Sequence, residues 1–403
     1  MNRRAASQTK LYLPHGFSFS AVTAGIKASG RPDLALAEAC AGTTATAVFT
    51  RNRVIAAPLI VGRESLAKAG GRVRAVIVNS GNANCATGKS GIEACRLVCR
   101  EVACLLGVKA AEIFSSSTGI IGVPLPTEKI TARLPELFAA RAENEQGIRA
   151  FAEAIMTTDT RAKLASARVP AGKSQVSILG VAKGAGMIHP QLATMLVYLF
   201  TDAAASPGEL NKILGAACDQ SFNCISIDGD TSTNDTVLLL ASGRGGVRLS
   251  AVRKKFSSAL LEVCLSLAEQ IVSDGEGVQH VIRLHVEQAK SRVEALRIAK
   301  AIAHSLLVKT AWAGADPNWG RILAATGACG VPVQPEKIEI AIGSQTVFRH
   351  GGVQPFDEMK AHEELAQPRC EVRVKLGRGR ASLQFLTADL TAEYVHINAD
   401  YST

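Results

Sequence analysis

Residues 180–196 combine side chains that could do chemistry: glycines crowd the first half, and an apolar run containing Thr194 fills the end. The stretch carries an ammonium, an imidazole and a hydroxyl, on Lys183, His189 and Thr194. By composition alone, a glycine-rich segment before a buried strand is a turn, and its threonine is a hydrogen-bonded core residue. A phosphate-binding loop is excluded because the spacing G-x-x-x-x-G-K-[ST] is absent. A catalytic and a purely structural interpretation both stay open.

The spacing of cysteines and histidines gives little support to a metal site. The ten cysteines contain no C-x-x-C pair, and the eight histidines show no H-x-x-x-H or H-E-x-x-H spacing. Without a secretion signal, the cysteines are expected to be reduced, small apolar residues. We therefore expect no bound metal.

Length and composition describe an ordinary globular chain of 403 residues, enough for two or three domains, with 47% apolar residues. The formal charge of +10 comes from scattered basic residues and aromatic residues are only 4%, so nucleic-acid binding is not favoured. The charge would attract anionic substrates such as glutamate. No segment reaches the roughly 20 apolar residues of a membrane span. The N-terminus lacks the apolar stretch of a signal peptide, so we expect a cytoplasmic protein, with a short organelle-targeting segment as the minor alternative.

Hydrophobic periodicity predicts short strands alternating with helices, the pattern of an α/β or α+β protein. An apolar strand is expected over 75–78, ending in the polar loop 79–84. A helix over 147–156 should stop near 157–160, which places threonines at a helix end. A long helix through Phe256 and Ile271 should end at 274–277, where glycines suit a C-terminal cap.

Further along, alternation predicts a strand at 282–286, and Ser291 with Glu294 forms a capping box that opens a helix running toward Val308. Alternating residues near 338–342, 372–374 and 383–385 predict antiparallel strands, with a hairpin turn at 377–379. These elements indicate a smaller C-terminal α+β domain, residues 281–403, after a main α/β domain, residues 1–280.

Eight collinear segments resemble the ornithine acetyltransferase / glutamate N-acetyltransferase family. Residues 183–196 match its self-cleavage pattern K-G-x-G-M-I-x-P-x-x-A-T-M-L. Together the segments cover nearly the whole chain, so chance or mere fold similarity explains them poorly. In family order, the others are VNSGNAN at 78–84, STGIIG at 117–122, MTTDT at 156–160, SIDGDTSTNDT at 226–236, DGEG at 274–277, DPNWGR at 316–321 and INADY at 397–401.

The resemblance implies a mixed-sheet core with an N-terminal-threonine nucleophile. In this family the Thr194 hydroxyl would attack the Ala193 carbonyl and convert the peptide bond to an ester, which water opens. Two chains result, 1–193 (α) and 194–403 (β). The freed α-amine, with an ordinary pKa of about 7.7–8.0, can act as general base near neutral pH. His189 as the base is a minor alternative, which unchanged turnover of His189→Ala would remove.

The resemblance also assigns site residues. Thr118 and Gly119 would hold the oxyanion of the tetrahedral intermediate. Lys183 suits an α-carboxylate, Glu276 an ammonium group and Asn398 the acetamide. The structural alternatives are a polar loop at 115–119, a solvated lysine, a charged helix end and a frayed C-terminus. The implied substrate contacts are Thr157, Lys183, Thr194, Glu276, Asn398 and Thr403.

The implied reaction is a double displacement in arginine biosynthesis. N2-acetylornithine acetylates Thr194, ornithine leaves, and glutamate takes the acetyl group. No metal or organic cofactor is implied, acetyl-CoA is a possible second donor, and the family assembles as a heterotetramer of two α and two β chains. The rivals are a self-processing amidase or aminopeptidase, and a binding protein that kept the fold.

The chain departs from the family pattern at two places. Residues 278–280 read Val-Gln-His where Ala-Thr-Lys is common, and Gln288 stands where a glycine is more usual. The first departure lies beside Glu276 and therefore bears on substrate preference, but it leaves the nucleophile untouched.

Overall fold

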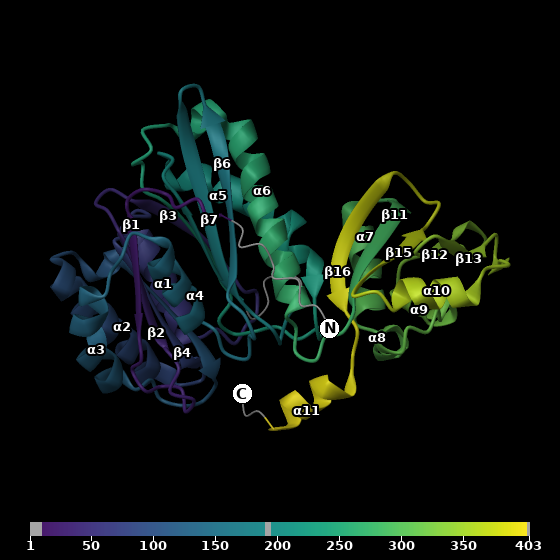
Figure 1. The fold of residues 1–403 in the computed structure, drawn as a ribbon, viewed down its shortest axis with the longest axis horizontal. Helices are drawn as coiled ribbons and strands as arrows, with labels where there is room; N and C mark the ends of the chain where they lie inside the picture. Colours follow the sequence, from purple (N-terminus) through teal and green to yellow (C-terminus); the bar gives the residue numbers. More distant parts are fainter. Residues whose placement is uncertain (1–9, 190–194, 401–403) are drawn as a thin grey trace.

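The computed structural model describes residues 10–189 and 195–400. Their strands form three sheets. Two of these sheets pack face to face, and the third belongs to a lobe that Figure 1 shows on the right, with helix α11 (Ala392–Asp400) extending below the rest. The mixed sheets with their covering helices confirm the predicted α/β (α+β) class.

The first sheet has the strand order β1-β2-β4-β5, with only the last pair parallel. One face packs against the second sheet, and helices cover the other through a core that includes Leu36, Ile77 and Val98. Its elements are β1 (Phe17–Val22), β2 (Leu34–Ala39), β4 (Ala75–Asn82), β5 (Ile113–Ile120), α1 (Ala57–Lys68), α2 (Gly88–Leu106), η1 (Ala110–Glu112) and α3 (Thr127–Ala139).

The second sheet has the order β3-β10-β8-β7-β6. Its inner face meets the first sheet in an aromatic core around Phe19, Phe151 and Phe200, and helices α5 and α6 cover its outer face. The result is a four-layer arrangement of helices, two sheets and helices. Its elements are β3 (Thr44–Phe49), β6 (Lys163–Ala171), β7 (Ser174–Lys183), β8 (Leu196–Thr201), α5 (Pro207–Gln220), η2 (Phe222–Cys224), β10 (Thr236–Ala241) and α6 (Leu249–Ser273). Helix α4 (Glu145–Ala154) packs mainly on β1 and β2 of the first sheet.

Helix α6 is the one helix in the described ranges that is long and apolar enough to cross a bilayer by length and composition. Half of its apolar window is buried, because Leu260, Val263 and Leu267 pack into the core below the second sheet. This burial is typical of the core helix of a folded domain.

The third sheet has the order β14-β13-β12-β15-β11-β16-β9. Helix α7 packs on β11 and β16 and contributes Ile298 and Ile302 to a separate core. Strand β9 comes from the segment between α5 and β10, so the chain passes between the second and third sheets three times, from β8 to β9, from β9 to β10 and from β10 to β11. The elements are β9 (Ile225–Ser226), β11 (Val281–Ala289), α7 (Arg292–Ala303), α8 (Leu306–Ala313), α9 (Trp319–Ala328), η3 (Pro335–Lys337), β12 (Glu339–Ile342), β13 (Gln345–Arg349), β14 (Gly352–Val353), α10 (Glu358–Leu365), β15 (Arg369–Lys375) and β16 (Ala381–Ala388).

Three local predictions differ from the structure. The predicted hairpin at 377–379 is wrong, because β11 lies between β15 and β16 and pairs with both. The helix opened by Ser291 ends at Ala303 instead of reaching Val308, because Ser305 accepts a hydrogen bond from the Val308 amide and starts α8. Strand β4 continues to Asn82, since its polar end pairs with β5.

The departure at Gln288 has a conformational meaning. Its φ is +56°, in the left-handed region that favours glycine, and it lies where the pairing of β11 with β16 shifts register between Val286 and Ala289. A glycine at this position would adopt the same backbone without strain.

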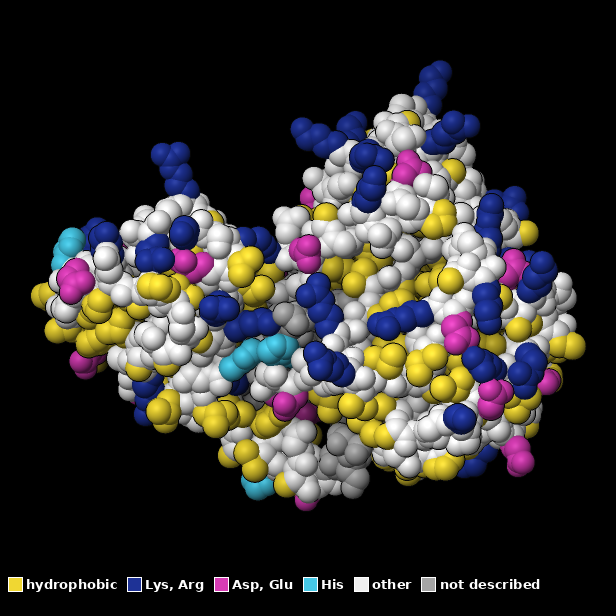
Figure 2. Space-filling view, turned by 180° about the vertical axis from the view of Figure 1, so that it is seen from behind, with side chains coloured by type: hydrophobic (Ala, Val, Ile, Leu, Met, Phe, Trp, Pro, Cys, Tyr) yellow, Lys and Arg dark blue, Asp and Glu magenta, His cyan; other side chains and the backbone are white. Residues whose placement is uncertain are grey.

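On the face drawn in Figure 2, charged side chains of both signs are mixed. Figure 2 shows Lys and Arg spread across one face, with acidic and apolar groups between them and no continuous basic stripe on that face.

Candidate active site

The carboxyl ends of the parallel strands β4 and β5 form one wall of the site. The Ser117 hydroxyl donates to Asn79 Oδ1 at 2.6 Å, and the Asn79 amide donates to the Asn82 carbonyl at 2.9 Å. Asn234, from the loop before β10, donates to the carbonyls of Ala83 and Ser117 at 2.7 and 2.8 Å. These buried bonds fix the strand ends, so the polar loop alternative does not describe this segment.

Gly119 is required by a close approach of the two strand ends. Its φ is +132°, and a β-carbon there would lie 2.3 Å from the Gly81 carbonyl carbon and 2.5 Å from the Asn82 nitrogen. Contacts that short do not exist, so any larger residue must push the strands apart. The sequence has glycines at residues 81 and 119. The register of β4 with β5 pairs these two residues and so explains why neither strand end can carry a larger side chain here.

Lys183, the last residue of β7, meets Thr118 in the interior. Its Nζ donates to Thr118 Oγ1 at 3.0 Å, and both side chains are buried. Burial lowers the pKa of Lys183, whereas the nearby carboxylate of Asp159 opposes that change. The solvated-lysine alternative is therefore wrong.

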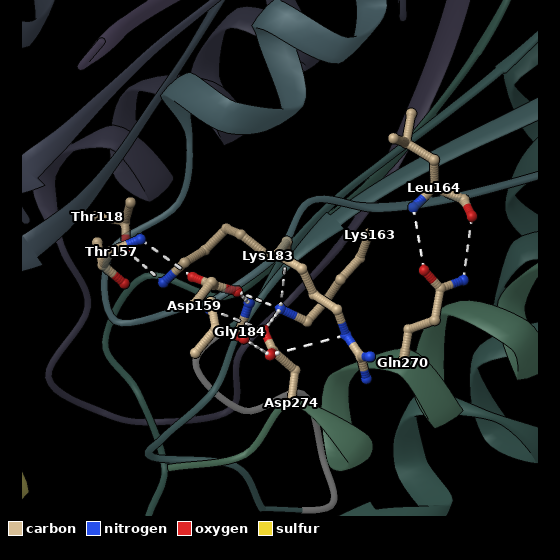
Figure 3. Close-up of polar contacts among 11 residues, drawn as sticks. Thr118, Thr157, Asp159, Lys163, Leu164, Lys183, Gly184, Gln270 and Asp274 are labelled. Carbon is tan, nitrogen blue, oxygen red and sulfur yellow. Dashed lines mark hydrogen bonds and ion pairs between the residues drawn. The ribbon is translucent and has the colours of Figure 1, made fainter. Parts of the chain in front are cut away.

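Lys183 belongs to a buried charge cluster with Asp159, Lys163 and Asp274, drawn in Figure 3. The Lys163 ammonium donates to one oxygen of each aspartate at 2.6 Å and is fully buried. Burial alone would raise the pKa of Asp159, but Lys163 and Lys183 together lower it to about 2. Asp159 also accepts hydrogen bonds from the Gly184 amide at 2.6 Å and the Thr157 amide at 3.0 Å. It therefore fixes the backbone at Gly184 and at Thr157.

Glu276 and Asn398 are in contact at the site, although 122 residues separate them in the sequence. Asn398 Nδ2, on α11, donates to Glu276 Oε2 at 2.9 Å. Gly186 makes room for this carboxylate, because a β-carbon there would lie 2.4 Å from Glu276 Oε2. The Thr391 hydroxyl donates to the Gly277 carbonyl at 2.7 Å and holds the start of the C-terminal segment in place.

Asp228 connects the loop before β10 to the backbone that precedes residue 190. Its carboxylate accepts from the amides of Met187 and Ile188 at 2.5 and 2.8 Å, and from the Tyr394 hydroxyl at 3.4 Å. Burial raises its pKa to about 6, although the amide hydrogen bonds act in the opposite direction. The bonds fix Met187, whose φ is +57°.

These side chains surround one cavity of about 250 Å³. Six predicted site residues line it: Thr118, Gly119, Thr157, Lys183, Glu276 and Asn398. Ala193, Thr194 and Thr403 lie outside the described residues. The cavity is also lined by Ala83, Ile121, Thr158, Gly186, Met187, Asp228, Asp230, Ser232, Thr233, Asn234 and Tyr394.

Two histidines near the predicted site have other partners. Among the described residues, His189 does not line the cavity; its Nε2 lies 3.3 Å from Lys300 Nζ and its ring packs on His304. Burial and Lys300 lower the pKa of His189 to about 4. His280, in the departure after Gly277, bonds Asp389 Oδ2 through Nδ1 at 2.9 Å.

The residues from 10 to 189 and from 195 to 400 contain no group of three or more His, Cys, Asp and Glu side chains that could hold an ion.

Comparison with known proteins places the chain in a family. A profile of the ArgJ family matches residues 18–403. The arginine biosynthesis bifunctional protein ArgJ of Methylococcus capsulatus is 45% identical, over 99% of this chain and 98% of that protein. The protein of the same name in Thermus thermophilus is 44% identical, over 97% and 99%. The chain belongs to the ArgJ family.

Solved structures also resemble the chain. A crystal structure of ornithine acetyltransferase from Mycobacterium tuberculosis, complexed with ornithine, is 37% identical over 45% of this chain and 94% of that chain, with a TM-score of 0.39.

ArgJ membership confirms the family predicted from the eight segments, and with it an acyltransferase of arginine biosynthesis. Asp228, Asp230 and Tyr394 line the cavity but are not among the site residues predicted from the sequence. The first two lie in the segment SIDGDTSTNDT, which resembles the family but carried no assigned role. Tyr394 lies outside every motif, and only the position of α11 brings it to the cavity.

Proposed function

We propose that the chain transfers an acetyl group from N2-acetylornithine to glutamate through an ester on Thr194. The observation that carries the proposal is the single cavity that gathers six residues from five separate segments of the chain. The ArgJ relatives, named for arginine biosynthesis and for two functions, support it. We also propose a cytoplasmic location, because the chain belongs to a family of biosynthetic enzymes.

Each half-reaction balances without an added cofactor. The Thr194 hydroxyl adds to the acetyl carbonyl of acetylornithine, and its proton passes to the Thr194 α-amine. When the C–N bond breaks, the α-amine donates that proton to the leaving nitrogen of ornithine. The amine of glutamate then attacks the ester, and the Thr194 oxygen regains a proton. Thr118 and Gly119 would stabilise both oxyanions, while Glu276, Asn398, Thr157 and Thr403 would orient the amino acid. Acetyl-CoA would enter, if at all, as an alternative donor of the same group.

The nucleophile would be released by self-cleavage after Ala193, which gives chains 1–193 and 194–403. Strands on either side of the cut support their continued association. β8 pairs along its whole length with residues 178–183 of β7, and β3 pairs with β10, so each pair joins one chain to the other. We propose a heterotetramer of two α and two β chains, and a division into domains near residue 280, where β11 begins.

The deciding experiment follows acetyl transfer and hydrolysis in the same reaction. Purified protein is incubated with N2-acetylornithine, with and without glutamate, and ornithine, N-acetylglutamate and acetate are quantified. We expect ornithine and N-acetylglutamate in equal amounts, with little acetate. Acetate matching the ornithine, whether or not glutamate is present, would instead identify a hydrolase.

Gly119→Ala should lower kcat for this transfer by about 10²-fold, because a β-carbon would displace the strand end that carries the oxyanion donors. Gly215→Ala is the matched control, since nothing lies within 4 Å of a β-carbon there. The measurement is steady-state kinetics of both variants. Equal rates would contradict the requirement for glycine at residue 119.

A further inference from the structure

Asp235 carries a buried carboxyl group immediately before β10. The residue is 1% exposed, and its Oδ1 accepts a hydrogen bond from the Met195 amide at 3.0 Å. The second oxygen, Oδ2, is also enclosed and has no hydrogen-bond partner among the described residues. Leaving a buried polar atom unpaired costs free energy, so an unpaired oxygen beside a proposed active site indicates a partner that forms in the working protein.

Strand pairing fixes this carboxyl at the start of β8. Strands β10 and β8 are parallel, with Thr236 opposite Leu196. The Thr236 amide donates to the Met195 carbonyl at 3.2 Å, while the Asp235 side chain accepts from the Met195 amide. Met195 is therefore held at both of its backbone polar groups. Because a peptide bond joins it directly to Thr194, the carboxyl lies one residue from the proposed nucleophile.

The described surroundings give Asp235 little compensation for its charge. Burial raises the pKa of the carboxyl well above its ordinary value, and four neighbours act weakly in the opposite direction: Met195, Ser232, Lys183 and Thr50. Lys183, on β7, is the charged side chain among them. The Thr50 hydroxyl gives its own proton to the Ser232 carbonyl at 3.0 Å. The uncut chain therefore favours a protonated Asp235, whereas an ammonium group beside it would favour the carboxylate.

We propose that Asp235 is a positioning residue, whose unpaired carboxylate oxygen holds the α-ammonium group that self-cleavage creates on Thr194. This inference rests on the proposed function, because that ammonium exists only in the cleaved protein. Cleavage supplies the amine, and transfer of the Asp235 proton to it gives a carboxylate and an ammonium. During turnover the carboxylate stabilises the ammonium that forms when the amine takes the Thr194 hydroxyl proton. Asp235 thus acts on the reaction through the amine.

Asp235→Asn separates this role from self-cleavage. Asparagine keeps an oxygen for the Met195 amide but removes the negative charge. Because no ammonium exists before the cut, we expect D235N to separate into residues 1–193 and 194–403 as completely as the wild type, measured as intact mass. With N2-acetylornithine and saturating glutamate, kcat for the cleaved variant should fall by about 10–10²-fold with little change in KM.

The pH profile reports the amine directly. The amine becomes a base only after it has lost a proton to solvent, so the acid limb of kcat/KM for acetylornithine follows its pKa. A carboxylate beside an ammonium raises that pKa. The limb of D235N should therefore move to lower pH, by about one unit or more. A loss of packing alone would lower the rate without moving the limb.

Asp202→Asn is the matched control. Asp202 follows the other end of β8 and is also buried, but its two oxygens accept from the amides of Ser177 at 2.9 Å and His15 at 3.3 Å. D202N removes the same charge from the same strand, so it should leave the acid limb in place. Asp235→Ala replaces D235N in every test if D235N does not fold.

Three results would overturn the inference. They are an unmoved limb in cleaved D235N, an equal shift in D202N, and a folded D235N that stays uncut, since the carboxyl would then act before the ammonium exists. Wild-type protein that transfers no acetyl group would overturn the proposed function and this inference with it. Active wild type with any of the three results would overturn this inference only.

Discussion

Thr194→Ala is expected to remain one chain of 403 residues, while the wild type separates under denaturing conditions into fragments 1–193 and 194–403. Alanine has no hydroxyl to attack the Ala193 carbonyl, so neither the ester nor the free amine can form. Acetyl transfer should fall to background, because nucleophile and base are lost together. Intact-mass measurement and N-terminal sequencing of the 194–403 fragment check the position of the cut.

Thr194→Ser is the control, because it keeps both hydroxyl and amine. It should cleave at the same peptide bond and retain measurable transfer. Cleavage of T194A at residue 193 would overturn the assignment of the nucleophile. An intact wild type would remove the free amine from the mechanism and favour a binding protein that kept the fold.

The residues around the cavity could be predicted from the sequence to the extent that local patterns mark them. Local patterns place glycines and hydroxyl residues at strand and helix ends, but the roles of Thr118, Gly119 and Thr157 were predicted from the family resemblance. The resemblance assigned these residues to one site, but it does not show how the fold brings them together. Their convergence depends on the pairing of β4 with β5 and on α11, which returns to Glu276 from the end of the chain.

The electrostatics behind the site could not be predicted in the same way. Lys163 and Asp274 are 111 residues apart, and each is a common polar residue at the end of an element. Nothing local distinguishes a buried ion pair from two solvated charges. The predicted hairpin at 377–379 was wrong for a similar reason. A sequence pattern identifies β15 and β16 as strands, but it does not show that β11 lies between them.

Lys163→Met should destabilise the protein by about 3–5 kcal/mol, because it leaves the carboxylates of Asp159 and Asp274 buried without their shared partner. Urea unfolding of the T194A chain, which stays covalently whole, measures the change as a lower midpoint. Lys68→Met is the matched control. Lys68 pairs with Glu64 at 3.8 Å with 71% of its side chain exposed, so its loss should not move the midpoint.

The pH dependence separates a lost ion pair from lost packing. In the parent T194A chain the pKa of Asp159 is lowered to about 2, so the stability that its charge contributes is present above its ordinary pKa near 3.8 and is lost as pH falls toward 2. Without Lys163, burial raises that pKa, and the carboxyl can be protonated at milder pH. The deficit of K163M should therefore shrink as pH falls from 7 toward 4. A deficit constant over this range would show that methionine packs poorly and that the charges at Asp159 and Asp274 contribute little.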